Sequence, residues 1–168
     1  MEEQDHPRSH SPVTEPEVDF DFAALVRLSR PLVAVLDLAF IRTRKVEAEV
    51  LDRSVAADLI GPSPTARTAE IQIGTQEPNY LVFKLVQEEV FVDSEGNEGA
   101  RVLVELESGW SYPEGFEPVD EQVTAAAQTL APRVVFPFYR ETVASMLTRL
   151  DVTSLMPGLM KFPPDDGE

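Results

Sequence analysis

The chain has 168 residues with a hydrophobic fraction of 43%, which supports one ordinary domain with a core but not two. Its net charge of −16 argues against nucleic acid or an anionic membrane as a partner, because both require a basic surface. The absence of cysteine excludes disulfides, a thiol nucleophile and cysteine-bound metals.

Residues 1–19 are rich in proline, serine, histidine and glutamate and contain almost no large apolar side chain. Such a segment cannot offset the entropy of ordering, so we expect a disordered acidic arm. It lacks the basic and apolar regions of a signal peptide, and no apolar run in the chain approaches the roughly 18 residues of a membrane helix. We therefore expect a cytoplasmic protein without membrane insertion.

The first expected element is a short amphipathic helix. Leu25, Leu28 and Leu32 recur at three- and four-residue steps with arginines between them. Proline lacks the amide hydrogen that a helix needs, so we expect this helix to end or bend at Pro31.

A β pattern begins near residue 36. Val46, Ala48 and Val50 alternate with charged residues, which is typical of a strand with one face in water. Ala39 and Ile41 lie on the opposite parity, so the apolar phase slips between Ile41 and Val46. One extra residue in the strand would swap its faces, and we therefore expect a β-bulge there.

Three more strands follow a loop. Residues 52–67 combine glycine, proline and aspartate and predict a loop with a single helical turn. The alternation over 69–73 predicts a second strand. Residues 80–92 and 99–110 predict a hairpin linked by the turn residues 93–99. Both arms are apolar on both parities near their middles, so we expect central strands covered on both faces.

The last third of the body predicts helices. Asp120 is a candidate N-cap, and Pro132 and Pro137 are expected to kink the chain or start new turns. Apolar residues after Pro137 keep helical spacing up to Leu150. Together these elements predict an α+β domain: a four-stranded antiparallel sheet packed on a long, proline-kinked helix.

The stretch from Leu130 to Phe162, with its Phe-Pro-Phe-Tyr-Arg-Glu block at 136–141, resembles the signature of the SecB export-chaperone family. Arg140 and Glu141 match the family's Arg-Glu pair. The resemblance implies a SecB-like domain over residues 20–162, followed by a disordered tail at 163–168, and assembly as a homotetramer. SecB proteins usually carry a second C-terminal helix, and the sequence here is too short and proline-rich for one.

The resemblance also implies an apolar groove that accepts unfolded polypeptide, for which flexible methionine side chains are well suited. The alternative from the residues alone is that the aromatics form a core and that the C-terminal arm lies on it. The residues expected to line the groove are Phe83, Trp110, Tyr112, Tyr139, Val143, Met146, Leu147, Leu155, Met156, Leu159 and Met160.

A second expected contact is acidic. By resemblance, Glu49, Glu95 and Glu98 fall near positions at which SecB binds the motor ATPase SecA. Lys45 stands where an acid is expected, which departs from the family pattern. The alternative is an ordinary solvated turn.

Catalytic chemistry has almost no support in the sequence. His6 and His10 are the only histidines, both in the acidic arm, and no phosphate loop or nucleophile motif occurs. We expect no enzyme, no metal and no cofactor.

The predicted function is that of an ATP-independent holdase whose partners are unfolded clients, with delivery of preproteins to the Sec translocase through SecA as its most specific form. Two alternatives stay open on the same fold: a chaperone dedicated to one client, such as an antitoxin, and a non-chaperone adaptor. A small-molecule-binding domain is a third, disfavoured by the lack of convergent polar residues.

Overall fold

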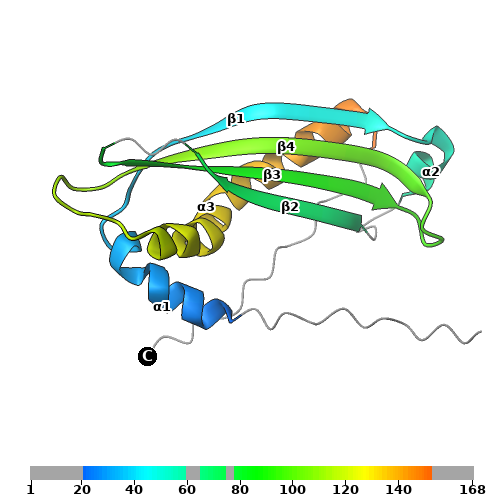
Figure 1. Cartoon of the computed structure of the whole chain (residues 1–168). Helices are drawn as coiled ribbons and strands as arrows, with labels where there is room; N and C mark the ends of the chain where they lie inside the picture. The colour runs from blue at the N-terminus through cyan, green and yellow to red at the C-terminus, as the bar shows by residue number, and fades with distance from the viewer. Residues whose placement is uncertain (1–20, 60–64, 75–77, 153–168) are drawn as a thin grey trace, which may run out of the picture.

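The structure, a computed structural model, describes residues 21–59, 65–74 and 78–152. The four strands form one antiparallel sheet in the order β1-β4-β3-β2, and a long helix crosses one face of it diagonally (Figure 1). The predicted α+β class and four-stranded antiparallel sheet are therefore confirmed. The elements in chain order are α1 (Phe22–Val33), β1 (Asp37–Val50), α2 (Arg53–Asp58), β2 (Thr65–Ile73), β3 (Tyr80–Val92), β4 (Glu98–Ser111) and α3 (Asp120–Arg149).

The β3–β4 hairpin forms the middle of the sheet, as predicted. Its turn is organised by Asp93, whose carboxylate accepts hydrogen bonds from the backbone amides of Glu95 (2.8 Å) and Asn97 (2.9 Å). The side-chain amide of Asn97 donates a third bond at 2.8 Å. Gly96 takes the positive φ of 87° that such a turn requires and that glycine adopts without strain.

Strand β1 contains the predicted irregularity. Its register against β4 shifts between Thr43 and Lys45, within the stretch where the apolar phase changes. A second shift, which the sequence pattern did not indicate, lies between Leu38 and Phe40. The first shift turns Val46 toward the helix-covered face, in the same layer as its partner Val104 of β4.

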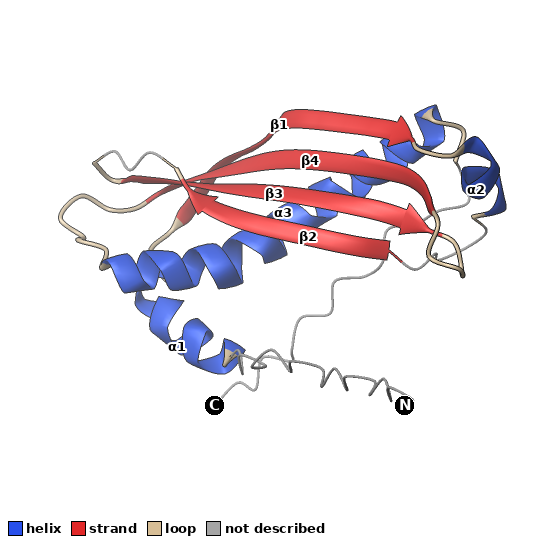
Figure 2. Ribbon diagram, turned by 45° about the vertical axis from the view of Figure 1, so that its right-hand side comes forward, coloured by secondary structure: helices blue, strands red, loops and turns tan. Residues whose placement is uncertain are grey.

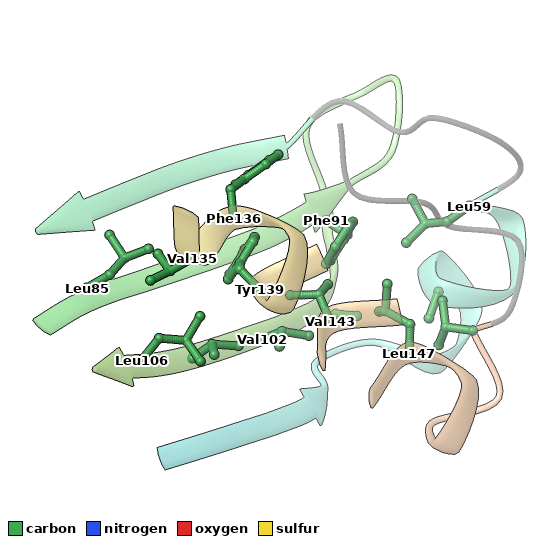
Figure 3. Close-up of a cluster of buried hydrophobic side chains, with 14 residues drawn as sticks. Leu59, Leu85, Phe91, Val102, Leu106, Val135, Phe136, Tyr139, Val143 and Leu147 are labelled. Carbon is green, nitrogen blue, oxygen red and sulfur yellow. The ribbon is translucent and has the colours of Figure 1, made fainter. Parts of the chain in front are cut away.

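The sheet and α3 enclose the larger of two apolar clusters, which we call the α2-end cluster (Figure 3). Strand residues such as Phe91 and Val102 meet Tyr139, Val143 and other residues from the C-terminal half of α3. Its buried members are Ala56, Leu59, Leu85, Phe91, Ala100, Val102, Val104, Leu106, Val135, Phe136, Tyr139, Val143, Leu147 and Val152.

The second cluster, the α1-end cluster, lies under the N-terminal half of α3. Here α1 packs on the side of α3 that faces away from the sheet, so that a partial third layer forms (Figures 1 and 2). Its buried members are Leu32, Leu81, Phe83, Trp110, Val123, Ala126, Ala127 and Ala131.

The ends of helices α1 and α3 differ from the prediction. Helix α1 does not end at Pro31 but continues to Val33, because the amide of Ala34 still donates to the carbonyl of Arg30 at 3.0 Å. Helix α3 begins one residue earlier than expected, at Asp120: Val119 is the N-cap, and the Gln122 side chain accepts a hydrogen bond from its amide at 3.5 Å. The same helix continues through Pro132 and Pro137.

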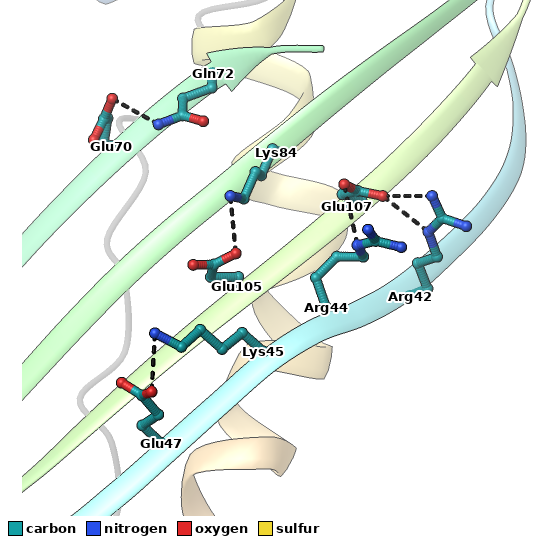
Figure 4. A network of polar contacts seen from close by, with 9 residues as sticks. All are labelled: Arg42, Arg44, Lys45, Glu47, Glu70, Gln72, Lys84, Glu105 and Glu107. Atoms are coloured by element: carbon teal, nitrogen blue, oxygen red, sulfur yellow. Dashed lines mark hydrogen bonds and ion pairs between the residues drawn. The ribbon is translucent and has the colours of Figure 1, made fainter. Parts of the chain in front are cut away.

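The central strands are covered on one face, not on both as expected from their apolar middles. Residues of β3 alternate between buried and half-buried along the whole strand. The outward face carries cross-strand ion pairs in which Glu107 contacts Arg42 at 2.7 Å and Arg44 at 3.4 Å, and Lys84 contacts Glu105 at 2.8 Å (Figure 4). The outward residues of β3, valines included, are half-buried, and the apolar stems of long charged side chains cover apolar surface of this kind without a second packed layer.

Candidate functional site

The structure divides the predicted client-binding residues between the two clusters. Phe83, Trp110 and Tyr112 lie in or against the α1-end cluster, together with Leu32 of α1. The α3 residues lie at the other end of the molecule: Tyr139, Val143 and Leu147 belong to the α2-end cluster and Met146 packs against it. The two groups therefore belong to separate apolar clusters in the described part of the chain. The predicted residues Leu155, Met156, Leu159 and Met160 lie outside the described residues.

Burial determines which of these side chains a client could contact. Phe83, Trp110, Tyr139, Val143 and Leu147 are at most 4% exposed, so intrachain packing occupies their side chains. This matches the alternative in which the aromatics form a core. Among the described members of the set, the two that keep partial access to solvent are Tyr112 and Met146.

Tyr139 has a specific structural role. Its hydroxyl donates a 2.8 Å hydrogen bond to the carboxylate of Glu89, and both side chains are fully buried. The ring stacks on Phe136 with centroids 5.9 Å apart. A buried carboxylate requires such donors because burial without a hydrogen bond is costly. Periodicity alone did not distinguish this role from client binding.

Several exposed apolar side chains were not among the predicted residues. Phe138 follows Pro137 on α3 and is 47% exposed, although its neighbour Tyr139 is buried. One residue on a helix turns the side chain by about 100°, so the aromatic block necessarily faces both ways. Leu38 (46% exposed) lies on β1 and Ile73 on β2, one on each edge of the sheet.

The two edge strands, β1 and β2, have backbone groups that can hydrogen-bond to another chain. β1 is 14 residues long and β2 is nine, and each has one side without a strand partner in the described chain. An open sheet edge offers backbone donors and acceptors to an added strand, whatever the sequence of that strand. Extended polypeptide and a second copy of this chain are ligands that such an edge can bind.

The predicted acidic residues gather at one end of the sheet. Glu49 faces Arg101 of β4 and forms an ion pair with it, while Glu95 and Glu98 lie at the β3–β4 turn. Arg101 also lies 3.7 Å from Glu88. The pKa of Asp93 in the same turn is lowered, chiefly because the Asn97 side chain hydrogen-bonds its carboxylate.

An open cavity of about 370 Å³ lies beside this acidic end, on the outward face of the sheet. Its charges are mixed rather than purely acidic, because Arg101 is part of the lining. The lining residues are Glu47, Ala48, Glu49, Glu88, Arg101 and Leu103.

Metal and membrane sites receive no support from the described part of the chain. It contains no group of three His, Asp or Glu residues placed to hold a metal ion. No helix in the same part is long and apolar enough to cross a membrane. His6 and His10 lie outside it.

Comparisons with known proteins identify the fold. No protein-family model matches the sequence, and the curated proteins contain no significant sequence match. Among solved structures, the chain is similar to the SecB-like chaperone Rv1957 of Mycobacterium tuberculosis, solved in complex with a ChAD peptide from the HigA1 antitoxin Rv1956. The TM-score is 0.69 at 21% identity, covering 85% of this chain and all of that one.

A second solved structure, a protein of unknown function from Streptococcus agalactiae, has a TM-score of only 0.34 at 15% identity, covering 76% of this chain and 97% of that one. This TM-score is too low to indicate a shared fold. The similarity to Rv1957 shows that this chain has the SecB-like fold.

Proposed function

We propose that this chain is an ATP-independent holdase that binds unfolded polypeptide. The observation that carries the proposal is the fold similarity to a SecB-like chaperone over that protein's whole length. Two open sheet edges and exposed apolar side chains beside them suit the same role, since they recognise backbone and apolar surface rather than a particular sequence. Several weak contacts along one extended client would add up to useful affinity.

The first experiment measures aggregation of a chemically unfolded model protein with increasing amounts of this chain and without ATP. A holdase suppresses aggregation at near-stoichiometric amounts, because it removes unfolded chains from the aggregation pathway. A well-folded chain that leaves aggregation untouched would exclude the general holdase.

The predicted apolar tail segment supplies a matched pair of variants for this assay. Met156→Asp with Leu159→Asp is expected to weaken suppression, because both changes remove apolar surface from the predicted binding segment. Thr153→Asp with Ser154→Asp adds the same charge to the same segment without removing apolar side chains, and should leave suppression unchanged. Equal effects of the two double variants would assign the loss to charge.

A dedicated chaperone for a single client is the second candidate. The observation that favours it is that the similar mycobacterial chaperone was solved with an antitoxin peptide. Suppression assays with several unrelated unfolded proteins separate the two candidates. A general holdase acts on all of them, whereas a dedicated chaperone acts on its own client and leaves the others to aggregate. A stable complex with a folded partner would instead favour an adaptor.

Export coupling is the most specific form of the proposal and concerns the acidic end of the sheet. A basic segment of SecA would meet Glu95 and Glu98, the two acids of the predicted set outside the Arg101 ion pair. Titration of this chain with SecA at low salt tests the contact. Glu95→Gln with Glu98→Gln should weaken it, while Glu114→Gln with Glu117→Gln, in the β4–α3 loop, should not. Absence of SecA binding would limit the proposal to a cytoplasmic chaperone outside the export pathway.

A further inference from the structure

Helix α1 covers the outer side of α3 through contacts along its whole length. The guanidinium of Arg133 on α3 lies 5.0 Å from the ring centre of Phe22, at the start of α1. In the middle of α1, the hydroxyls of Ser29 and Thr129 lie 3.3 Å apart in a buried contact. Near its end, Leu32 is fully buried in the α1-end cluster. The two helices therefore run antiparallel, with α1 as an outer layer (Figure 2).

Helix α1 packs on α3 mainly through half-buried side chains: Phe22, Ala24, Leu25, Val26 and Val33 are half-buried. Ser29 and Leu32 are its only buried residues among twelve, and Leu28 is 40% exposed. Pro31 removes one backbone hydrogen bond from the last turn. A helix of this length is marginal without tertiary contacts, and elements with few buried apolar contacts open first.

The connection between α1 and β1 is short. Only Ala34, Val35 and Leu36 separate the two elements, and Ala34 is exposed. Val35 and Leu36 pack against the α1-end cluster and so hold the start of β1 in place. Lifting α1 would require the backbone to turn near Ala34, where the amides of Ala34 and Val35 donate to the carbonyls of Arg30 and Leu32, both at 3.0 Å.

The covered surface adjoins residues expected from the sequence to bind clients. Leu32 shares its cluster with Phe83 and Trp110, and Tyr112 packs against the same cluster. Removal of α1 would open this end of the cluster and the outer side of α3 around Ala125 and Thr129. The segment that fills this place has its contact residues at i, i+7 and i+10, the spacing of one face of a helix.

We propose that α1 is a displaceable lid, and that amphipathic client segments bind the α3 surface that it covers. The proposal rests on the proposed holdase function and adds to it the binding surface, the client pattern and the competition with α1. A client of this class has apolar or small side chains at the spacing of Phe22, Ser29 and Leu32. The apparent Kd of such a client equals its Kd for the open form divided by the fraction of molecules in which α1 is open.

The Ser29–Thr129 contact provides a direct test, because the chain has no cysteine of its own. The double variant Ser29→Cys with Thr129→Cys should form a disulfide that locks α1 closed, since the two side chains already face each other in the buried interface. We expect the oxidised variant to need about fivefold or more chain for half-suppression of aggregation, and reduction to restore the activity. The single-cysteine variants under oxidant are the controls. Equal activity in the oxidised and reduced states would overturn the lid.

A second pair of variants tests the opposite direction. Leu32→Ala removes the main apolar anchor of α1 and should strengthen client binding, because the lid opens more often. Leu28→Ala makes the same change at an exposed position of the same helix and should have no effect. A loss of client binding in Leu32→Ala, with its thermal unfolding still cooperative, would contradict the proposal.

Opening of α1 is also measurable without any client, which separates the lid from the holdase function. The thiol of Ser29→Cys should react with a thiol reagent much faster than the molecule unfolds globally. Labelling no faster than global unfolding would show that α1 does not open, and would overturn the proposal even if the chain suppresses aggregation. If labelling is fast but the chain never suppresses aggregation, then α1 opens but does not compete with clients. That outcome would overturn the client-binding part of the proposal.

Discussion

Gln87 and Glu89 are polar side chains of β3 that point into the apolar layer between the sheet and α3. Both are fully buried, but their surroundings differ. Glu89 accepts a hydrogen bond from Tyr139, whereas neither amide atom of Gln87 has a hydrogen-bond partner among the described residues. Mutations at the two positions should therefore have opposite effects on stability. Loss of the hydrogen bond to Glu89 should destabilise the fold, whereas replacement of Gln87 by an apolar side chain should stabilise it.

Tyr139→Phe is expected to lower the free energy of unfolding by about 1–3 kcal/mol, because it keeps the ring but leaves a buried carboxylate with one donor fewer. The shift of the urea midpoint at unchanged m-value measures it. Tyr112→Phe, at a half-buried position, is the matched control and should stay within about 0.5 kcal/mol of the parent. Equal stabilities of both variants would mean that the Glu89 contact contributes nothing.

Gln87→Met is expected to raise the free energy of unfolding by about 1–3 kcal/mol, because an unbranched apolar side chain replaces a buried amide that has no partner. Thermal and urea unfolding measure the change. The same substitution at the exposed Gln72 controls for the general effect of methionine on a strand. A destabilised Gln87→Met protein would indicate that the amide is satisfied in solution.

At the scale of elements, some features are stabilised by hydrogen bonds between nearby residues and others by packing between distant parts of the chain. The β3–β4 turn is organised by hydrogen bonds within five residues, around a carboxylate at Asp93. The α1–α3 contact joins residues 100 positions apart and exists only in the folded molecule. The turn is therefore expected to form independently of the rest of the fold, and the α1 contact is expected to be lost first.

The pH dependence of stability tests the turn. The pKa of Asp93 is lowered, chiefly by the Asn97 side chain, so this group stabilises the fold at pH values above its unfolded pKa near 3.8. The contribution is lost as pH falls through the lower folded pKa, because protonation then favours the unfolded chain. Asn97→Ala should therefore unfold at a lower temperature than the parent near pH 6, with the difference shrinking below about pH 3.8. A difference that stays constant down to pH 2.5 would rule out this linkage.

At the scale of the whole molecule, the sheet is asymmetric. One face is covered by α3, the other carries ion pairs, and both edges lack a strand partner among the described residues. β1 is long and mostly exposed, and a long open edge is a site at which chains associate. Association at this edge would be consistent with the homotetramer that the family resemblance implies.

Leu38→Lys tests the association edge. A lysine on β1 places a charge where a neighbouring chain would pack, so we expect light scattering to report a smaller assembly than for the parent. Leu28→Lys introduces the same charge at a similarly exposed position on α1 and should leave the assembly unchanged. A parent protein that is already monomeric at the same concentration would exclude the tetramer.

Much of the fold was predictable because its signals are local. The hairpin, the bulge in β1, the helical turn after it and the long C-terminal helix each follow from periodicity or turn chemistry within a few residues. The candidate site was less predictable. Periodicity identifies Tyr139, Val143 and Leu147 as apolar positions on one helix face, but whether that face meets a client or the chain's own sheet depends on what packs against it.

The sequence by itself therefore determined the order and type of the main helices and strands, the acidic character and the absence of cysteine chemistry, because these depend on residue type and spacing alone. The tertiary structure alone decided three further matters. It divided the expected groove residues between two clusters, it left one face of the central strands to ion pairs, and it placed α1 over α3. Each of these depends on contacts between residues far apart in the chain, which burial and register create and which no local pattern encodes.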